Sequence, residues 1–158
     1  MTITRHAYQG EADLPRLLGG ESEAAAYVKL HRAAFQSDSM TTAWRERIIR
    51  TPQYRPNLDL VIAAPDGALV AFCVGWYAPT RRVGQVEPMG VHPDYTRLGL
   101  ARALLLDLLH RFRALGAEMA TVETNLGRAP ARGAYQSVGF QEAHTVRRLE
   151  KWASAPSN

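Results

Sequence analysis

Hydrophobic residues recur with helical spacing through the first third of the chain. From Ser22 onward the apolar positions fall three and four residues apart, which predicts a helix carrying Ala25, Val28, Leu30, Ala34 and Phe35 on its buried side. A second helix is predicted over Thr41 to Arg50, with an apolar side made of Trp44, Ile48 and Ile49.

The residues before Ser22 give a weaker pattern. Ile3 to Tyr8 fits a short first strand, and Glu11 to Leu18 fits a short helix interrupted near Pro15 and closed by Gly19-Gly20.

The middle of the chain changes to strand patterning. Leu58 to Ala64 and Leu69 to Tyr77 are apolar runs of strand length, and between them Pro65-Asp66-Gly67 has the residues that a tight reversal requires. The two runs therefore predict a β-hairpin. A turn near Arg81 to Gly84 leads to a third antiparallel strand, Gln85 to Val91.

Helical spacing returns in the last third. Arg97 to Leu115 has one apolar face, and Gly116 ends the helix. We expect a buried strand over Glu118 to Thr124, a helix over Pro130 to Ser137, and a last pair of short strands reaching Trp152.

The succession of strand, helix and strand around residues 85 to 124 predicts a parallel crossover, which should be right-handed. The fold class is therefore mixed α/β, with a mostly antiparallel central sheet and flanking helices.

Size and composition agree with a single domain over residues 1–158. A chain of 158 residues with 46% hydrophobic and 22% charged residues is an ordinary globular length and composition, and only residues 153–158 read as a frayed tail. The longest apolar stretch has about half the length that a membrane-spanning helix needs. The N-terminus has no apolar run typical of a secretory signal. We therefore expect a cytoplasmic protein that does not bind membranes.

Cys73 is the only cysteine, which excludes an internal disulfide. A lone cysteine could serve as a nucleophile. Because this one lies inside the apolar run Ala71 to Trp76, buried packing is the favoured interpretation.

The net charge of +4 favours an anionic ligand. Nucleic acid is disfavoured, because like charges never run longer than Arg81-Arg82 or Arg147-Arg148 and no aromatic residues interleave with a basic stripe. A small phosphorylated ligand is the preferred expectation, with solvated surface arginines as the alternative.

The junction after the third hairpin strand has the features of an anion site. A helix N-terminus offers free N–H groups and a positive dipole end, and small residues at Gly99 and Ala101 let an anion approach the backbone. Arg97 and Arg102 can add charge-assisted bonds. A helix start whose small residues merely pack is the alternative, and a Rossmann dinucleotide site is disfavoured because the glycines do not open the first βαβ unit.

Two motifs in order resemble the GNAT superfamily of acyl-CoA-dependent N-acetyltransferases. The first is the family's Q/R-x-x-G-x-G/A loop, present here as Thr96-Arg97-Leu98-Gly99-Leu100-Ala101 with Thr at the first place. The second is an Asn followed by Y-x-x-x-G-F, matched by Asn125 and by Tyr135 to Phe140. In many members the Asn lies nearer the Tyr, where this chain has Arg128. The resemblance is clearest over residues 58–152.

The resemblance implies a GNAT-like acyltransferase fold with acetyl-CoA as co-substrate. Its pantetheine would lie along Met89, Gly90 and Val91, whose backbone would also polarise the thioester carbonyl. Its diphosphate would bind from Thr96 to Arg102, and Asn125 would be a further contact. The complete set of expected cofactor-binding residues is Met89, Gly90, Val91, Thr96, Arg97, Leu98, Gly99, Leu100, Ala101, Arg102 and Asn125.

Two residues are candidates for proton transfer. Strand alternation places Gln85, Glu87, Met89 and Val91 on one face. Glu87 is the ionisable residue of that face and resembles the family's base, unless it is an exposed carboxylate paired to Arg81 or Arg82. Tyr135 matches the tyrosine that protonates the CoA thiolate, unless its ring simply packs beside Phe140.

The expected function is transfer of an acetyl group from acetyl-CoA to a primary amine of a small molecule, by direct attack in a ternary complex. The small acceptor is preferred because the sequence shows no peptide-docking appendage. The alternatives are a non-catalytic acyl-CoA-binding module and a protein N-acetyltransferase acting on a lysine or an N-terminal amine. No metal site is expected, because His92, His110 and His144 are scattered. His31 faces the substrate side without further support, and a homodimer is left open.

Overall fold

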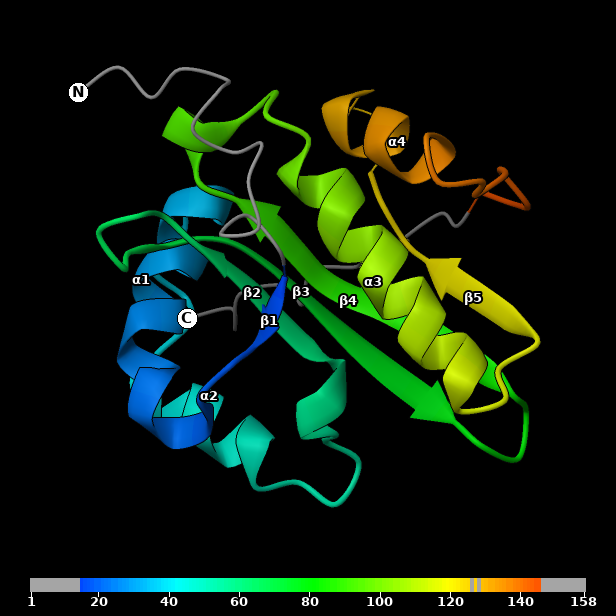
Figure 1. Cartoon of the computed structure of the whole chain (residues 1–158), viewed down its shortest axis with the longest axis horizontal. Coiled ribbons are helices and arrows are strands. Elements are labelled where there is room, and N and C mark those ends of the chain that lie inside the picture. The colour runs from blue at the N-terminus through cyan, green and yellow to red at the C-terminus, as the bar shows by residue number, and fades with distance from the viewer. Residues whose placement is uncertain (1–14, 126, 128, 146–158) are drawn as a thin grey trace, which may run out of the picture.

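A five-stranded sheet forms the centre of the molecule (Figure 1), and a computed structural model describes residues 15–125, 127 and 129–145. Its strands are β1 (Arg16–Leu17), β2 (Asp59–Ala63), β3 (Leu69–Ala78), β4 (Val83–Val91) and β5 (Met119–Val122). They lie in the order β1-β2-β3-β4-β5. All neighbours are antiparallel except β4 and β5, which are parallel. This confirms the predicted hairpin, the third antiparallel strand and the parallel crossover.

Four α-helices of the described residues accompany the sheet: α1 (Ala24–Phe35), α2 (Thr42–Ile49), α3 (Leu100–Ala114) and α4 (Ala129–Gln136). All four were predicted from the sequence. The helix predicted from Arg97 begins only at Leu100, because Arg97 and Gly99 have positive φ angles of 65° and 82°.

The sheet separates two hydrophobic clusters. Leu60 and Ile62 of β2 point into the cluster under α3, whereas Val61 between them joins the cluster under α1. The α3 cluster also takes Leu104, Leu108 and Phe112 from the predicted apolar face. Figure 1 shows α3 lying along β4 and β5.

Glycines allow α3 to lie close to the sheet. A Cβ built on Gly84 of β4 would lie 2.5 Å from the Phe112 ring, and one on Gly75 of β3 would lie 2.6 Å from Leu108. These two positions form a slot that the Phe112 and Leu108 side chains fill.

Two predicted elements differ from those in the structure. Part of the helix expected over Glu11 to Leu18 is strand β1, because Arg16 and Leu17 pair with Val61 and Leu60 and so add an edge to the sheet. The strand near Glu118 exists as β5 but is not buried, because it pairs only with β4 among the described strands and leaves Met119 exposed.

The last pair of strands is not seen over residues 141–145, and its remainder lies outside the described residues, as does the strand expected from Ile3 to Tyr8.

The buried side of α2 matches the prediction only in part: Ile49 packs against the α1 cluster, but the rest differs. Trp44 is exposed and Arg45 is buried, because Asp59 at the start of β2 offers a carboxylate partner for the guanidinium. An apolar pattern cannot reveal this arrangement.

Candidate functional site

The candidate site lies where β4 and β5 stop pairing, a place that we call the β4–β5 fork. The parallel pairing runs from Val83–Met119 to Val86–Val122 and goes no further. Glu87 on β4 follows Val86, and Glu123 follows Val122 at the end of β5. Two acidic residues therefore lie at the fork.

A cleft of about 520 Å³ lies at this fork. It is lined from several elements by His31, Phe35, Ser37, Ser39, Val86, Glu87, Pro88, Met89, Glu123, Thr124, Asn125, Ala131 and Tyr135. The structure thus brings four of the sequence-predicted site residues together, namely Glu87, Met89, Asn125 and Tyr135. Gly90, Val91 and the residues from Thr96 to Arg102 do not line this cleft.

The face assignment along β4 needs correction. Between the pairs Cys73–Met89 and Gly75–Val86, β3 has one residue and β4 has two, Glu87 and Pro88. This β-bulge inverts the alternation. Met89 and Val91 consequently join Val86 in packing against the α3 cluster, on the opposite face from Gln85.

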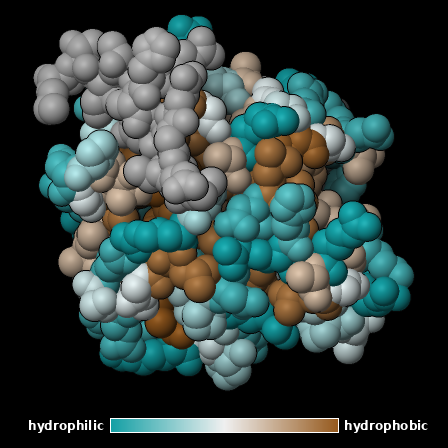
Figure 2. Space-filling view, viewed as in Figure 1, coloured by the Kyte–Doolittle hydropathy of each residue, from teal (hydrophilic) through white to brown (hydrophobic). Residues whose placement is uncertain are grey.

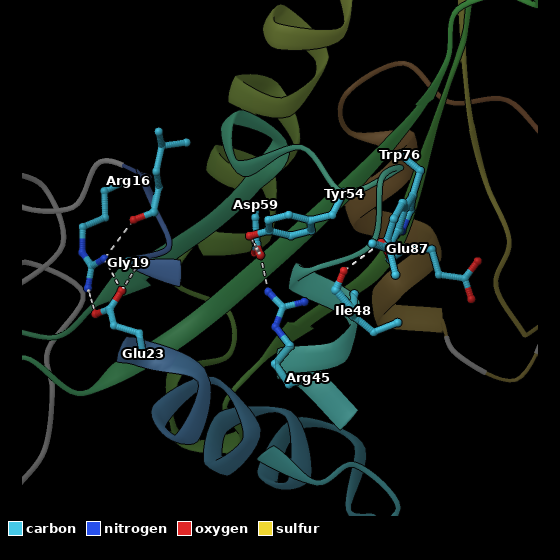
Figure 3. A network of polar contacts seen from close by, with 11 residues as sticks. Arg16, Gly19, Glu23, Arg45, Ile48, Tyr54, Asp59, Trp76 and Glu87 are labelled. Carbon is cyan, nitrogen blue, oxygen red and sulfur yellow. Dashed lines mark hydrogen bonds and ion pairs between the residues drawn. The ribbon is translucent and has the colours of Figure 1, made fainter. Parts of the chain in front are cut away.

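Glu87 is exposed in the cleft and keeps its carboxylate beside Gln85, whose Nε2 donates to Oε2 at 3.0 Å. The indole Nε1 of Trp76 donates to the Glu87 carbonyl at 2.7 Å, which holds the backbone at the bulge. Figure 3 shows the Glu87 carboxylate pointing away from Trp76. Arg82, an expected alternative partner of Glu87, instead pairs with Glu118.

Tyr135 packs in the hydrophobic core and also lines the cleft. It is 8% exposed, and its ring meets the Phe140 ring edge-on at 5.9 Å between centroids. The packing interpretation and the cleft-lining position therefore hold for the same side chain.

The loop before α3 presents backbone to solvent. Ala103 N donates to the Gly99 carbonyl as the first turn of the helix closes, so the preceding N–H groups have no partner within the helix. Leu98 and Leu100 anchor the loop in the core, whereas Arg97, Gly99 and Arg102 are exposed. Thr96 Oγ1 donates to the Pro93 carbonyl at 3.2 Å, so its hydroxyl proton is engaged.

These residues fit the diphosphate of acetyl-CoA. A Cβ at Gly99 would meet nothing within 4 Å, so the space above the helix N-terminus is open. Backbone N–H groups, the helix dipole and two arginines supply donors of the kind that bind phosphates. Asn125 lines the cleft, while its Oδ1 accepts from Gly127 N at 2.9 Å.

Sequence reasoning missed Glu123 and left His31 without support. Glu123 could have been found from its position, because it lies near the end of the strand predicted over Glu118 to Thr124, which the crossover makes parallel to β4. His31 lies on α1, and burial together with the Arg45 charge lowers its pKa below the usual 6.5. The imidazole is therefore neutral near pH 7.

A buried polar cluster fixes α2 against β2 (Figure 3). Arg45 pairs with Asp59, and Tyr54 donates its hydroxyl to the same carboxylate oxygen at 2.6 Å. The guanidinium also stacks 3.7 Å from the Tyr27 ring centroid. Burial raises the pKa of the Asp59 carboxyl, and Arg45 opposes that rise.

Cys73 is fully buried in β3, as the sequence indicated. Burial raises the pKa of its thiol, so the nucleophilic thiolate does not form near neutral pH.

Within residues 15–125, 127 and 129–145, no group of three His, Cys, Asp or Glu side chains could hold a metal ion. No described helix is long and apolar enough to cross a bilayer. On the face in Figure 2, hydrophobic residues form small separate patches among hydrophilic ones.

Comparisons with known proteins agree with this geometry. A family model described as the acetyltransferase (GNAT) family matches residues 24–140. The mycothiol acetyltransferase of Thermomonospora curvata is 31% identical over 121 residues, which are 75% of this chain and 40% of that protein. The chain thus spans well under half the length of that relative.

The chain is also similar to a shorter relative and, in fold, to a solved acetyltransferase structure. The ribosomal protein bS18-alanine N-acetyltransferase of Escherichia coli K12 is 42% identical over 105 residues, which are 66% of this chain and 68% of that protein. The crystal structure of the aminoglycoside N-acetyltransferase AAC(6')-Iy in complex with CoA superposes with a TM-score of 0.70 at 15% identity, covering 88% of this chain and 94% of that one.

Proposed function

The chain belongs to the acetyltransferase (GNAT) family, and we propose that it moves the acetyl group of acetyl-CoA to the primary amine of a small molecule by direct attack in a ternary complex. The observation that carries this proposal is the cleft at the β4–β5 fork, where a carboxylate, a tyrosine and the backbone of β4 meet. Its volume suits a small ligand. The relative from Thermomonospora curvata is named for mycothiol, a small molecule.

Each proposed residue has one part in the transfer. Acetyl-CoA supplies the acetyl group activated as a thioester. Glu87 accepts a proton from the incoming ammonium, directly or through water, so that the amine nitrogen can attack the carbonyl carbon. A backbone N–H group of Met89 or Val91 stabilises the developing oxyanion. Tyr135 donates its hydroxyl proton to the sulfur as the C–S bond breaks.

Binding of the co-substrate is assigned to β4 and the loop after it. Beyond Val86 the edge of β4 is not paired with β5. His92 N donates to the Val70 carbonyl, so alternation along the antiparallel pair turns the Gly90 backbone toward β3 and leaves the backbone groups of Met89 and Val91 facing the open edge, where pantetheine would bind. The N–H groups from Gly99 to Arg102 and the Arg97 and Arg102 side chains would hold the diphosphate, with Thr96, Leu98 and Asn125 shaping the site.

Glu87→Gln tests the base. The variant keeps the shape and the hydrogen bond with Gln85 but removes the proton acceptor, so kcat/KM at pH 7 should fall at least about tenfold. Part of the loss should be recovered at high pH, where more amine is already neutral. Steady-state rates from pH 6 to 10 measure both effects.

Glu123→Gln is the matched control, because it removes a second carboxylate from the same cleft. We expect it to change kcat/KM less than Glu87→Gln. A larger loss in Glu123→Gln, with a wild-type pH profile in Glu87→Gln, would place the base after β5 and reject Glu87.

A second candidate acceptor is the N-terminal amine of a protein. The Escherichia coli relative, at 42% identity, is named for the alanine of a ribosomal protein. An acceptor panel of amino sugars, alkylamines and peptides beginning with alanine, with product detected by mass spectrometry, separates the two candidates. Tight CoA binding without transfer to any amine would instead indicate a non-catalytic acyl-CoA-binding module.

A further inference from the structure

His31 lies in the cleft on the side opposite the sheet residues. It comes from α1, whereas Glu87 comes from β4 and Glu123 follows β5. The described lining residues thus include two carboxylates, one imidazole and no arginine or lysine. Ser37 and Ser39 add hydroxyl groups beside the end of α1.

Aromatic rings hold the imidazole in one orientation. Its centroid lies 4.6 Å from that of Phe35 and 5.7 Å from that of Phe72, with an interplanar angle of 26° to the latter. Tyr27 contributes a third ring at 6.2 Å. A ring packed in this way cannot turn to exchange its two nitrogens without disturbing the α1 cluster.

The two nitrogens of His31 have different surroundings. Nδ1 is buried and has no hydrogen-bond partner among the described residues. Nε2 is therefore the nitrogen that can meet a ligand in the cleft. Unpaired buried polar atoms are uncommon and destabilising, so the unpaired Nδ1 favours a functional role for His31.

This asymmetry determines the tautomer. Protonated Nδ1 would be a buried N–H donor without an acceptor, which is less tolerable than an unpaired lone pair. The proton of the neutral ring should consequently sit on Nε2. Desolvation and Arg45 on α2 disfavour the imidazolium, although Glu87 and Glu123 face the same cleft.

We propose that His31 contacts the acceptor substrate, its Nε2–H donating a hydrogen bond to an oxygen that the acceptor carries near its primary amine. The cleft then selects amines with a neighbouring hydroxyl or carbonyl oxygen over plain alkylamines. This inference rests on the proposed function and specifies its substrate class. An amino sugar and the first residue of a peptide share this chemistry.

The experiment compares three acceptors: glucosamine, alanine amide and propylamine, which lacks the oxygen. Wild-type kcat/KM should be at least about tenfold higher for one of the first two than for propylamine, equivalent to about 1.4 kcal/mol. Whichever of glucosamine and alanine amide is preferred identifies the source as a sugar-type or a peptide-type amine.

Two substitutions separate the hydrogen bond from the packing. His31→Phe keeps an aromatic ring but removes both nitrogens, and it should raise KM for the preferred acceptor about tenfold while leaving propylamine within twofold. His31→Gln places an amide N–H near the Nε2 position and should retain most of the preference. His110→Asn, an exposed histidine on α3 outside this cleft, is the matched control.

Side-chain nitrogen NMR gives a readout that is independent of turnover. At pH 7 the His31 signals should show a neutral ring with the proton on Nε2, and an Nδ1–H tautomer would overturn the inference. An equal loss for all three acceptors in His31→Phe, or no wild-type preference, would also overturn it. Absence of transfer to every amine would reject the proposed function itself, and the inference with it.

Discussion

Tyr135 combines a structural ring with a hydroxyl at the cleft. Its ring belongs to the α3 cluster, and the same residue lines the cavity that holds Glu87. Because the two parts of the side chain have different tasks, a substitution that removes only the hydroxyl can separate them.

Tyr135→Phe should lower kcat by about 100-fold, since the leaving thiolate loses its proton donor. CoA affinity by calorimetry and the thermal midpoint should stay close to wild type, because the ring remains. Tyr77→Phe removes a hydroxyl away from the cleft and should leave kcat unchanged. Unaltered turnover in Tyr135→Phe would mean that water supplies the proton.

The Arg45–Asp59 pair should matter for stability far more than an exposed pair. Arg45 is 2% exposed, and Arg45→Met would leave the Asp59 carboxylate buried without its cation, at a cost of about 3–5 kcal/mol. Arg50→Met breaks an exposed pair with Glu21 that solvent screens, so it should cost far less than Arg45→Met. Urea unfolding measures both free energies.

The double variant Arg45→Met with Asp59→Leu tests the reason for that cost. Replacing both charges by apolar groups should restore much of the stability, since no unpaired charge remains. A cost in Arg45→Met no greater than that in Arg50→Met would contradict the assignment of a buried ion pair.

At the scale of elements, α3 can lie close to the sheet because two glycines of the sheet have no side chain. Gly84 and Gly75 leave the space that Phe112 and Leu108 occupy. Since α3 begins with the proposed diphosphate loop and β4 carries Glu87, this packing positions two parts of the site relative to each other.

Gly84→Ala should therefore destabilise the protein by about 1–3 kcal/mol through overpacking against Phe112. Combining it with Phe112→Leu should recover part of the loss, because the smaller side chain makes room. Gly133→Ala is the control, since a Cβ there meets nothing within 4 Å. Equal stability of Gly84→Ala and wild type in urea would show that α3 can shift away from β4.

The charge of the whole molecule should assist binding of the co-substrate. The chain has a net charge of +4, and Arg97 and Arg102 stand exposed beside the start of α3. An anion approaching this end meets the general field of the protein, the helix dipole and two local charges.

The double variant Arg97→Ala with Arg102→Ala should weaken CoA binding at least about tenfold and reduce its dependence on salt. Calorimetry at about 50 and 300 mM salt spans strong and weak screening. Arg113→Ala removes a charge from the last turn of α3 and should change the affinity little. Equal losses in Arg113→Ala and the double variant would indicate only a general effect of net charge.

Local patterns in the sequence were sufficient to predict the hairpin and the four helices and to identify the family motifs. Periodicity reports which side of a helix or strand is apolar, and Gly99 and Tyr135 belong to motifs that are contiguous in the chain. The sequence therefore indicated the α/β class, the acetyltransferase family and two candidate regions of the site.

Tertiary structure decided the rest, because it depends on residues distant in sequence. The bulge at Glu87 and Pro88 adds one residue to β4 and so reverses the faces that simple alternation assigns to Met89 and Val91. Burial of Arg45 depends on Asp59. His31 and Glu123 become site residues only because α1 and the end of β5 meet at the fork, where the two parallel strands stop pairing.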